Sequence, residues 1–238
     1  MIQGAFSNLT YKINHEENII ILEKVVKSYR NGMVIALNDV NLSIKAGTFT
    51  VFGGVSGSGK TTLLNLIGGL DRPTSGNIIV LNHKYDEMSE SELTRFRRKN
   101  IGFIWQFSNL FPNLTALQNV MMPLEFDPSW NYTRAKKRAK EVLLNLGLTN
   151  RLDHRPNQMS GGEQQRVAIA RAIVNYPKII LADEPTGNVD ADNATKIAKL
   201  LKKLNEEQDI TVVVVTHDIS LFKNYGEIIK IRNGRIIT

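Results

Sequence analysis

The chain has 238 residues, a length typical of one large α/β domain or of a core domain with an insertion. Hydrophobic residues make up 42% and charged residues 22%, a globular balance that excludes a disordered chain. The absence of cysteine excludes disulfides, thiolate metal sites and a cysteine nucleophile. No apolar run approaches the roughly 20 residues needed to cross a bilayer. Residues 1–18 lack a signal-peptide pattern, and we expect them to form a flexible tail.

The formal net charge of +7 permits an anionic partner. The excess basic residues gather in two clusters, at 95–99 and at 134–140. Few aromatic side chains that could stack on bases lie in these clusters. We therefore interpret both clusters as solvated helix faces and expect no nucleic-acid partner.

The first third of the chain predicts strands, a glycine-rich turn and a helix. Residues 19–26 and 40–44 have the apolar spacing of strands. A short apolar strand at 50–52 enters the glycines, and residues 61–67 have the pattern of a buried helix. A turn then leads to a further strand at 78–81.

Helical patterns dominate the centre of the chain. Three helix starts have a capping box, Ser or Thr followed three residues later by Glu or Gln: Ser89 with Glu92, Thr115 with Gln118, and Ser160 with Glu163. Between 108 and 157 the strand pattern lapses, which predicts a helical insertion with a helix at 134–146. Alternating elements then return: strands at 179–182, 211–215 and 228–231, a helix at 193–205, and a hairpin turn at 233–234.

The glycine-rich turn at 54–61, GVSGSGKT, matches the pattern G-x-x-x-x-G-K-[ST] between a strand and a helix. Its glycines let backbone N–H groups point at an anion, and the following helix start adds a favourable field. Lys60 can neutralise the β- and γ-phosphates, and Thr61 can offer its hydroxyl to Mg²⁺. The residues predicted to bind phosphate are Gly54, Ser56, Gly57, Ser58, Gly59, Lys60, Thr61 and Thr62.

Two adjacent carboxylates, Asp183 and Glu184, follow the apolar strand at 179–182. The carboxyl end of a strand in an open α/β sheet faces the ligand crevice. Because successive strand residues point to opposite sides, the two carboxylates need not share one role. Asp183 suits Mg²⁺, directly or through water, and Glu184 suits a general base that polarises the attacking water.

The segment at 159–166, MSGGEQQR, has the local pattern of a capped helix start. It resembles the LSGGQ signature of ATP-binding cassette (ABC) ATPases, and the resemblance extends over residues 19–237. The signature residues implied to contact nucleotide are Ser160, Gly161, Gly162 and Glu163. Four stretches resemble most the lipoprotein-release, macrolide-export and FtsE-like branch: 70–76, 101–106, 114–120 and 182–188.

The resemblance also implies roles for four single residues. Tyr29 stands where the family has an aromatic that stacks on adenine, and a strand-end core residue is the alternative. Gln106 matches the catalytic Q-loop glutamine, which contacts Mg²⁺ and senses the transmembrane partner. Residues 187–190, GNVD, resemble the D-loop, which Asp190 closes, and His217 matches the catalytic H-loop histidine that contacts the γ-phosphate.

By resemblance, the fold class is α/β, in a single domain over residues 19–238. It is expected to combine a P-loop NTPase core with a RecA-like mixed sheet, an antiparallel β portion at the N-terminus, and an α-helical subdomain at 108–157. The implied cofactors are ATP and Mg²⁺, and the implied activity is ATP hydrolysis. Two copies are expected to pair head to tail, with the loop around Lys60 of one and the signature of the other enclosing ATP.

The implied function is that of a transporter subunit driving a transmembrane permease, at the cytoplasmic inner face of the cell membrane. The cargo would be a lipoprotein, a peptide or a drug-like substrate, exported or extracted from the membrane. The main alternative is an FtsE-like ATPase that signals through a membrane partner without transport. A cassette ATPase of nucleic acid or ribosomes is disfavoured, since those usually have two cassettes or a long coiled-coil insertion. Apolar residues in 107–114 either contact the permease or pack within the insertion.

Overall fold

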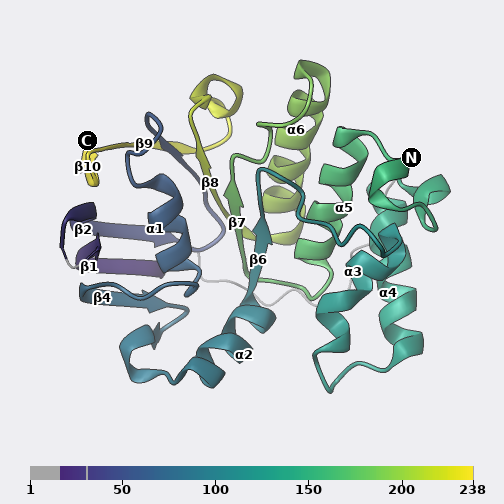
Figure 1. The fold of residues 1–238 in the computed structure, drawn as a ribbon, viewed down its shortest axis with the longest axis horizontal. Coiled ribbons are helices and arrows are strands. Elements are labelled where there is room, and N and C mark those ends of the chain that lie inside the picture. Colours follow the sequence, from purple (N-terminus) through teal and green to yellow (C-terminus); the bar gives the residue numbers. More distant parts are fainter. Residues whose placement is uncertain (1–16, 31, 238) are drawn as a thin grey trace.

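The computed structural model describes residues 17–30 and 32–237 (Figure 1). The predicted tail at 1–18 lies mostly outside the described residues, and its last residue, Asn18, begins strand β1. A small antiparallel sheet lies at one side of the molecule, a larger sheet at the centre, and α3 and α4 at the other side (Figure 1).

The small sheet is antiparallel, in the order β2-β1-β4-β5. Its strands are β1 (Asn18–Tyr29), β2 (Val34–Lys45), β4 (Ser75–Val80) and β5 (His83–Lys84). The sequence predicts an N-terminal antiparallel portion, and this portion is confirmed. It is completed by β4 and β5, which come from beyond the phosphate loop.

The central sheet is mixed, as predicted, in the order β10-β9-β3-β8-β7-β6. Its strands are β3 (Phe49–Gly53), β6 (Ile101–Ile104), β7 (Ile179–Asp183), β8 (Thr211–Thr216), β9 (Glu227–Arg232) and β10 (Arg235–Ile237). All neighbours pair in parallel except β9 and β10, which form a hairpin at the edge. Asn233 and Gly234 have φ of 50° and 72°, the positive angles that a two-residue hairpin turn requires.

The helices are α1 (Lys60–Ile67), α2 (Glu90–Asn100), α3 (Ala116–Glu125), α4 (Tyr132–Asn145), α5 (Gly161–Ile173) and α6 (Ala191–Gln208). Short 3-10 helices occupy Tyr85–Glu87, Thr149–Arg151, Pro156–Gln158 and Ile219–Phe222. The three predicted capping boxes are confirmed, with Ser89, Thr115 and Ser160 as the N-caps of α2, α3 and α5.

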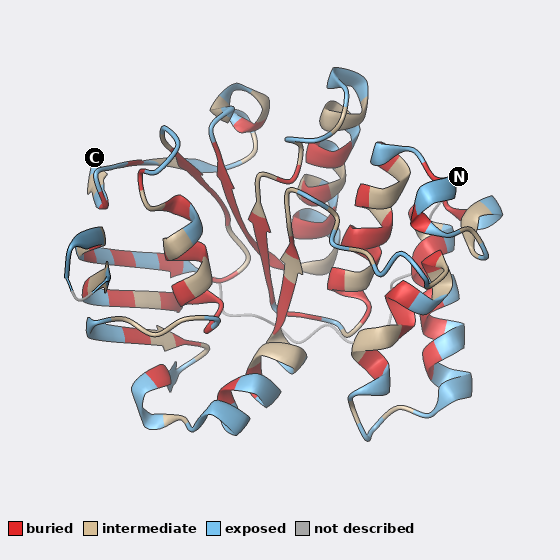
Figure 2. Ribbon diagram, in the orientation of Figure 1, coloured by how far each residue is buried: buried red, intermediate tan, exposed pale blue. Residues whose placement is uncertain are grey.

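The central strands are buried on both faces, which is why they are nearly continuous apolar runs (Figure 2). Alternate residues of β8 divide between two cores. Val213 and Val215 pack with α1 and the small sheet, whereas Val212 and Val214 pack with α3, α4, α5 and α6. Helices α1 and α5 therefore lie on opposite faces of the central sheet.

The sequence alone suggests that both basic clusters are solvated helix faces, but the structure shows that several of their arginines bind backbone carbonyl groups. Arg138 is buried, and its Nε donates to the carbonyl oxygen of Val174 at 3.1 Å. Arg97 and Arg98 donate to the carbonyl oxygens of Gly69 and Phe126. The pattern missed this because these carbonyl acceptors lie on elements distant in sequence.

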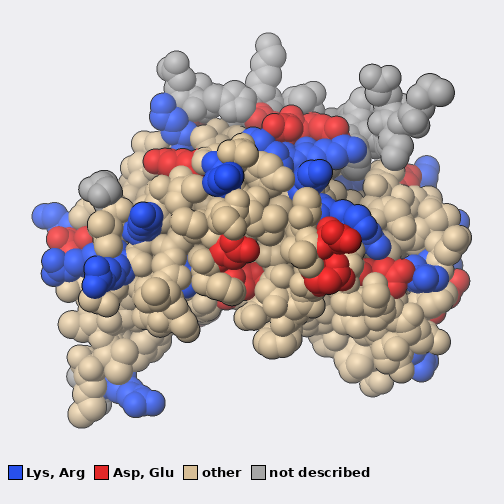
Figure 3. All heavy atoms as spheres, turned by 90° about the horizontal axis from the view of Figure 1, so that it is seen from above, with Lys and Arg blue, Asp and Glu red and all other residues tan. Residues whose placement is uncertain are grey.

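Seen from above, basic and acidic side chains lie interspersed on the surface (Figure 3). In the part of the chain that the structure describes, no helix is long and apolar enough to cross a bilayer.

Candidate active site

The phosphate loop joins β3 to α1 at the carboxyl ends of the parallel strands. Gly59, the N-cap of α1, has φ of 106°, and no described side chain caps this helix start. A Cβ on Gly59 would lie 2.5 Å from the Ala36 carbonyl oxygen, and one on Gly54 would lie 2.4 Å from that of Ile231. Only glycine fits these two positions, and the N–H groups of the first turn are left for an anion.

Three polar side chains of this loop fit a bound triphosphate with its metal ion. Lys60 is buried, and its Nζ donates to the carbonyl oxygens of Gly54 at 2.8 Å and Val55 at 3.0 Å. The Ser58 hydroxyl is buried and has no hydrogen-bond partner among the described residues, so it can donate to a phosphate oxygen. The Thr61 hydroxyl lies 3.2 Å from Oδ1 of Asp183. A hydroxyl beside a carboxylate is the oxygen donor set that Mg²⁺ prefers.

Asp183 is held where its charge is unfavourable. Burial raises the pKa of its carboxyl group, and the charge of Glu184 raises it further, while Thr61 and Lys60 act in the opposite direction. A bound divalent cation would favour the ionised carboxylate.

Glu184 and His217, both predicted as catalytic, are brought into direct contact. His217 follows β8, the neighbour of β7, and its Nδ1 lies 2.9 Å from Oε1 of Glu184. The same oxygen accepts the His217 backbone N–H at 2.9 Å, and Oε2 accepts the Thr216 hydroxyl at 2.9 Å. Glu184 has φ of 46°, so the backbone turns sharply between the two carboxylates. The two carboxylates therefore have different surroundings, and the separate roles expected of them stay a prediction.

Gln106 lies beside the D-loop. A Cβ on Gly187 would lie 3.0 Å from Nε2 of Gln106, and the Asn188 side chain donates to the Gln106 carbonyl oxygen at 2.8 Å. Asp190 caps α6, and its Oδ1 accepts the Asn193 backbone N–H at 2.9 Å. This backbone hydrogen bond lowers the pKa of Asp190.

The signature segment forms the exposed start of α5. The Ser160 hydroxyl accepts the Glu163 N–H at 3.3 Å, and the Glu163 carboxylate accepts the Ser160 N–H at 2.9 Å. Arg151 donates to the same carboxylate at 2.7 Å, and the hydrogen bond from the Ser160 backbone is the main cause that lowers the pKa of Glu163. Ser160 and Gly161 are exposed, and a Cβ on Gly161 would lie 3.3 Å from the Asn188 carbonyl oxygen. The signature therefore adjoins the D-loop of its own chain.

Tyr29, at the end of β1, lies beside α1. Its hydroxyl donates to Oδ2 of Asp71 at 2.9 Å. Burial and the Asp71 hydrogen bond raise its pKa, whereas a hydrogen bond with Thr62, the third residue of α1, lowers it. Sequence reasoning missed the contacts of Asp71, Arg151 and Thr216, because no local spacing marks them. The sequence marks Asp71 only as part of the stretch at 70–76, which resembles the family.

The chain also matches a known protein family in its sequence. The model described as ABC transporter matches residues 37–187. The chain belongs to the ABC transporter family. It is an ABC ATPase that binds ATP with Mg²⁺, as the sequence predicts.

Individual ABC proteins extend the likeness to nearly the whole chain. The uncharacterized ABC transporter ATP-binding protein MJ0796 of Methanocaldococcus jannaschii is 50% identical over 223 residues, which are 92% of this chain and 95% of that protein. The lipoprotein-releasing system ATP-binding protein LolD of Idiomarina loihiensis is 43% identical over 214 residues, 89% and 93% of the two chains. The predicted lipoprotein-release and FtsE-like branch is thereby confirmed.

Solved ABC structures confirm the fold. The dimeric post-hydrolysis state of the MJ0796 cassette, bound to ADP and Pi, has a TM-score of 0.84 at 48% identity, covering 92% of this chain and 97% of that one. CbiO1 from Clostridium perfringens, part of the transporter complex cbiONQ, also has a TM-score of 0.84 at 30% identity, covering 94% and 88%.

Proposed function

We propose that this ABC ATPase works as a head-to-tail pair that encloses two Mg·ATP and drives a membrane permease. The positions of two helix starts support head-to-tail pairing of two copies. The phosphate loop leads into α1 and the signature forms the start of α5, and these helices pack on opposite faces of the central sheet (Figure 1). Two helix starts suited to anions thus belong to separate parts of one chain. A second copy would complete each site, and dimeric structures of the MJ0796 cassette support this.

In the completed site, the side chains would divide the work. Lys60, Ser58 and the loop N–H groups would hold the β- and γ-phosphates, and Thr61 and Asp183, assisted by Gln106, would hold Mg²⁺. The metal ion neutralises charge that develops on the phosphate oxygens.

Glu184 would accept a proton from the attacking water as general base. Its contacts with Thr216 and His217 would orient its carboxylate, and His217 and the partner copy's signature would contact the γ-phosphate. Tyr29 would stack on the adenine, and Asp190 would lie at the interface between the copies.

Complementation tests the shared site. Lys60→Ala disables the phosphate loop, and Ser160→Arg blocks the signature. Each variant alone should fail to dimerise with Mg·ATP, whereas a mixture contains one intact composite site and should form an ATP-dependent heterodimer, detected by cross-linking. No heterodimer in the mixture would contradict head-to-tail pairing.

A groove at Trp105, the residue before Gln106, supports a membrane partner. A cavity of about 330 Å³ is lined by Trp105, Phe103, Pro123, Arg98 and Arg171. Phe107 and Phe111, in the predicted docking segment, are 67% and 49% exposed. Leu110, in contrast, packs against the core, so we assign docking only to the exposed residues of the segment. A permease docked here would hold the chain on the inner face of the cell membrane.

The substrate is proposed from the branch. The similarity to LolD, an ATP-binding protein of a lipoprotein-releasing system, supports lipoprotein as the cargo, with peptide or drug-like cargo as the alternatives. Purification of the tagged chain from gently solubilised membranes tests this proposal. A co-purified multi-span permease supports transport, whereas recovery of ribosomal or nucleic-acid-bound proteins alone contradicts it. ATPase turnover with a membrane partner and no transported species would instead favour FtsE-like signalling.

A further inference from the structure

Tyr29 is partly exposed, yet both its hydroxyl and its ring are held by neighbouring side chains. Tyr29 is 38% exposed, so part of its ring is open to a ligand. Its hydroxyl donates to Oδ2 of Asp71 at 2.9 Å. The ammonium of Lys27 lies over the same ring, 4.9 Å from its centroid. Ordering a side chain costs conformational entropy. A partly exposed tyrosine gains little from being ordered unless its ring binds a ligand.

Asp71 joins these contacts. Its Oδ1 accepts from Lys27 Nζ at 2.6 Å and from the Arg72 N–H at 2.7 Å, while Lys27 also donates to the Arg72 carbonyl oxygen at 2.8 Å. Lys27 lies on β1 two residues before Tyr29, so its side chain emerges on the same side of the strand. Both side chains on β1 are thus tied to one carboxylate after α1.

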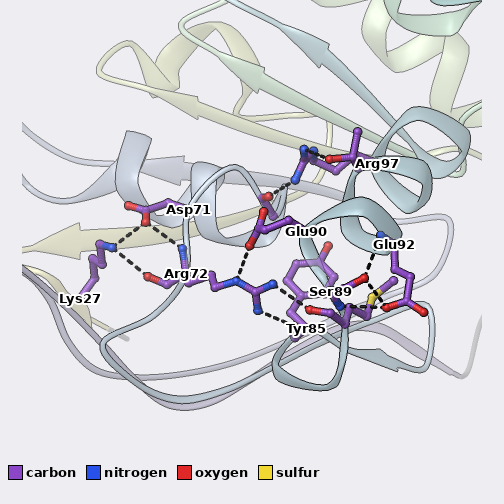
Figure 4. A network of polar contacts seen from close by, with 11 residues as sticks. Lys27, Asp71, Arg72, Tyr85, Ser89, Glu90, Glu92 and Arg97 are labelled. Atoms are coloured by element: carbon purple, nitrogen blue, oxygen red, sulfur yellow. Dashed lines mark hydrogen bonds and ion pairs between the residues drawn. The ribbon is translucent and has the colours of Figure 1, made fainter. Parts of the chain in front are cut away.

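The loop that carries Asp71 is anchored in turn (Figure 4). The guanidinium of Arg72 donates to Glu90 at 2.7 Å and to the carbonyl oxygens of Tyr85 and Met88, each at 2.8 Å. Glu90 is the first residue of α2. The position of Asp71 is therefore set by the small sheet, by the loop after α1 and by the start of α2 together.

We propose that Lys27 and Asp71 are positioning residues that hold Tyr29 ready to stack on the nucleobase. The inference rests on the proposed role of Tyr29 as the adenine platform. Lys27 backs the ring with a cation, which aromatic faces attract, and Asp71 fixes the hydroxyl end. The ring then loses little rotamer freedom when a base arrives.

Equilibrium binding with two ligands tests the inference. Mg·adenylyl imidodiphosphate carries the base and resists hydrolysis, whereas Mg·tripolyphosphate presents the phosphates alone. Asp71→Ala and Lys27→Met should each weaken binding of the adenine nucleotide about 2- to 10-fold, as expected for the lost pre-organisation of one side chain. Their tripolyphosphate Kd should stay unchanged. In steady state, KM for ATP should rise while kcat is retained.

A double substitution shows whether Asp71 acts by positioning Tyr29 or by contacting the nucleotide directly. In Tyr29→Ala, a further Asp71→Ala substitution should produce no additional loss of nucleotide affinity, because Asp71 acts through Tyr29. Tyr29→Phe keeps the ring and removes the hydroxyl contact, so it should resemble Asp71→Ala. Glu206→Ala, which removes the exposed partner of an i,i+4 ion pair with the half-buried Lys202, is the control.

Each contrary result has a distinct meaning. If Tyr29→Ala weakens nucleotide binding but Asp71→Ala and Lys27→Met do not, the positioning inference is wrong and the adenine platform stands. If Tyr29→Ala itself leaves the affinity unchanged, the platform proposal fails as well. Equal weakening for both ligands would mean that the phosphate loop is damaged, and it would also overturn the inference.

Discussion

At the scale of single residues, Glu184 combines a left-handed backbone with a carboxylate that accepts two hydrogen bonds and lies beside the His217 ring. Its φ of 46° costs about 1–2 kcal/mol for a residue other than glycine. The hydrogen bond from its N–H to the Val215 carbonyl oxygen and the contacts from Thr216 and His217 hold it in place. The side chain is 15% exposed, so the site is open to water while the orientation of the carboxylate stays defined.

Glu184→Gln should keep ATP affinity and lose most turnover. The amide has nearly the same shape but is a poor base, and a positioned general base contributes roughly 10²–10⁴-fold. Single-turnover hydrolysis and a separate nucleotide-binding titration measure the two properties. Near-normal turnover in this variant would contradict the role of Glu184.

Lys60→Ala should weaken nucleotide binding itself. The ammonium lies in the phosphate loop, where its Nζ donates to two loop carbonyl oxygens that a bound phosphate can replace as partners. Binding is measured with a fluorescent ATP analogue, and circular dichroism confirms that the variant is folded. Unchanged affinity in a folded variant would refute the phosphate-loop assignment.

At the scale of elements, the end of α5 depends on a residue of α4. Arg138 is buried and donates to the carbonyl oxygens of Val174 and Ile173, which follow or end α5, and its guanidinium lies 3.9 Å from the Tyr176 ring centroid. Helix ends leave carbonyl groups without intrahelical partners, and burial makes such groups costly. Arg138 thus joins the helical segment to the helix that begins with the signature.

Arg138→Met should lower the free energy of unfolding by about 2 kcal/mol, because buried carbonyl groups lose a charged donor. Lys137→Met, at the exposed neighbouring position of α4, is the control and should change stability by no more than about 0.5 kcal/mol. Urea denaturation measures both. Equal effects of the two substitutions would show that the buried contact contributes nothing.

At the scale of the whole molecule, the proposed head-to-tail pairing would make ATP a ligand of the paired state, because α1 and α5 lie on opposite faces of the central sheet. A ligand that binds only the paired, folded state stabilises it by about 2.7 kcal/mol at 100 times its Kd. In Glu184→Gln with Mg·ATP, the Tm should therefore rise with protein concentration, and without nucleotide it should not. Differential scanning fluorimetry over a range of protein concentrations measures this. A Tm independent of concentration in both conditions would argue for a complete site within one chain.

The sequence by itself determined the features that arise within a few neighbouring residues. The phosphate loop, the three capping boxes and the turn at Asn233 and Gly234 follow from local backbone geometry. The mixed α/β fold follows from alternating patterns of period 2 and 3.6 together with the family resemblance. Element boundaries differ by a few residues, as for α6, which is expected at 193–205 and found at Ala191–Gln208.

The tertiary structure alone decided which distant residues meet. Glu184 touches His217 because β7 and β8 are neighbours in the sheet, and no local spacing encodes strand order. Tyr29 meets Asp71, and Arg138 is buried, for the same reason: each partner lies more than thirty residues away, as the separations of 42 and 36 residues show. The opposite faces of α1 and α5 follow from how both helices pack on one sheet. Residue types thus determine local chemistry, and packing decides which groups share a site.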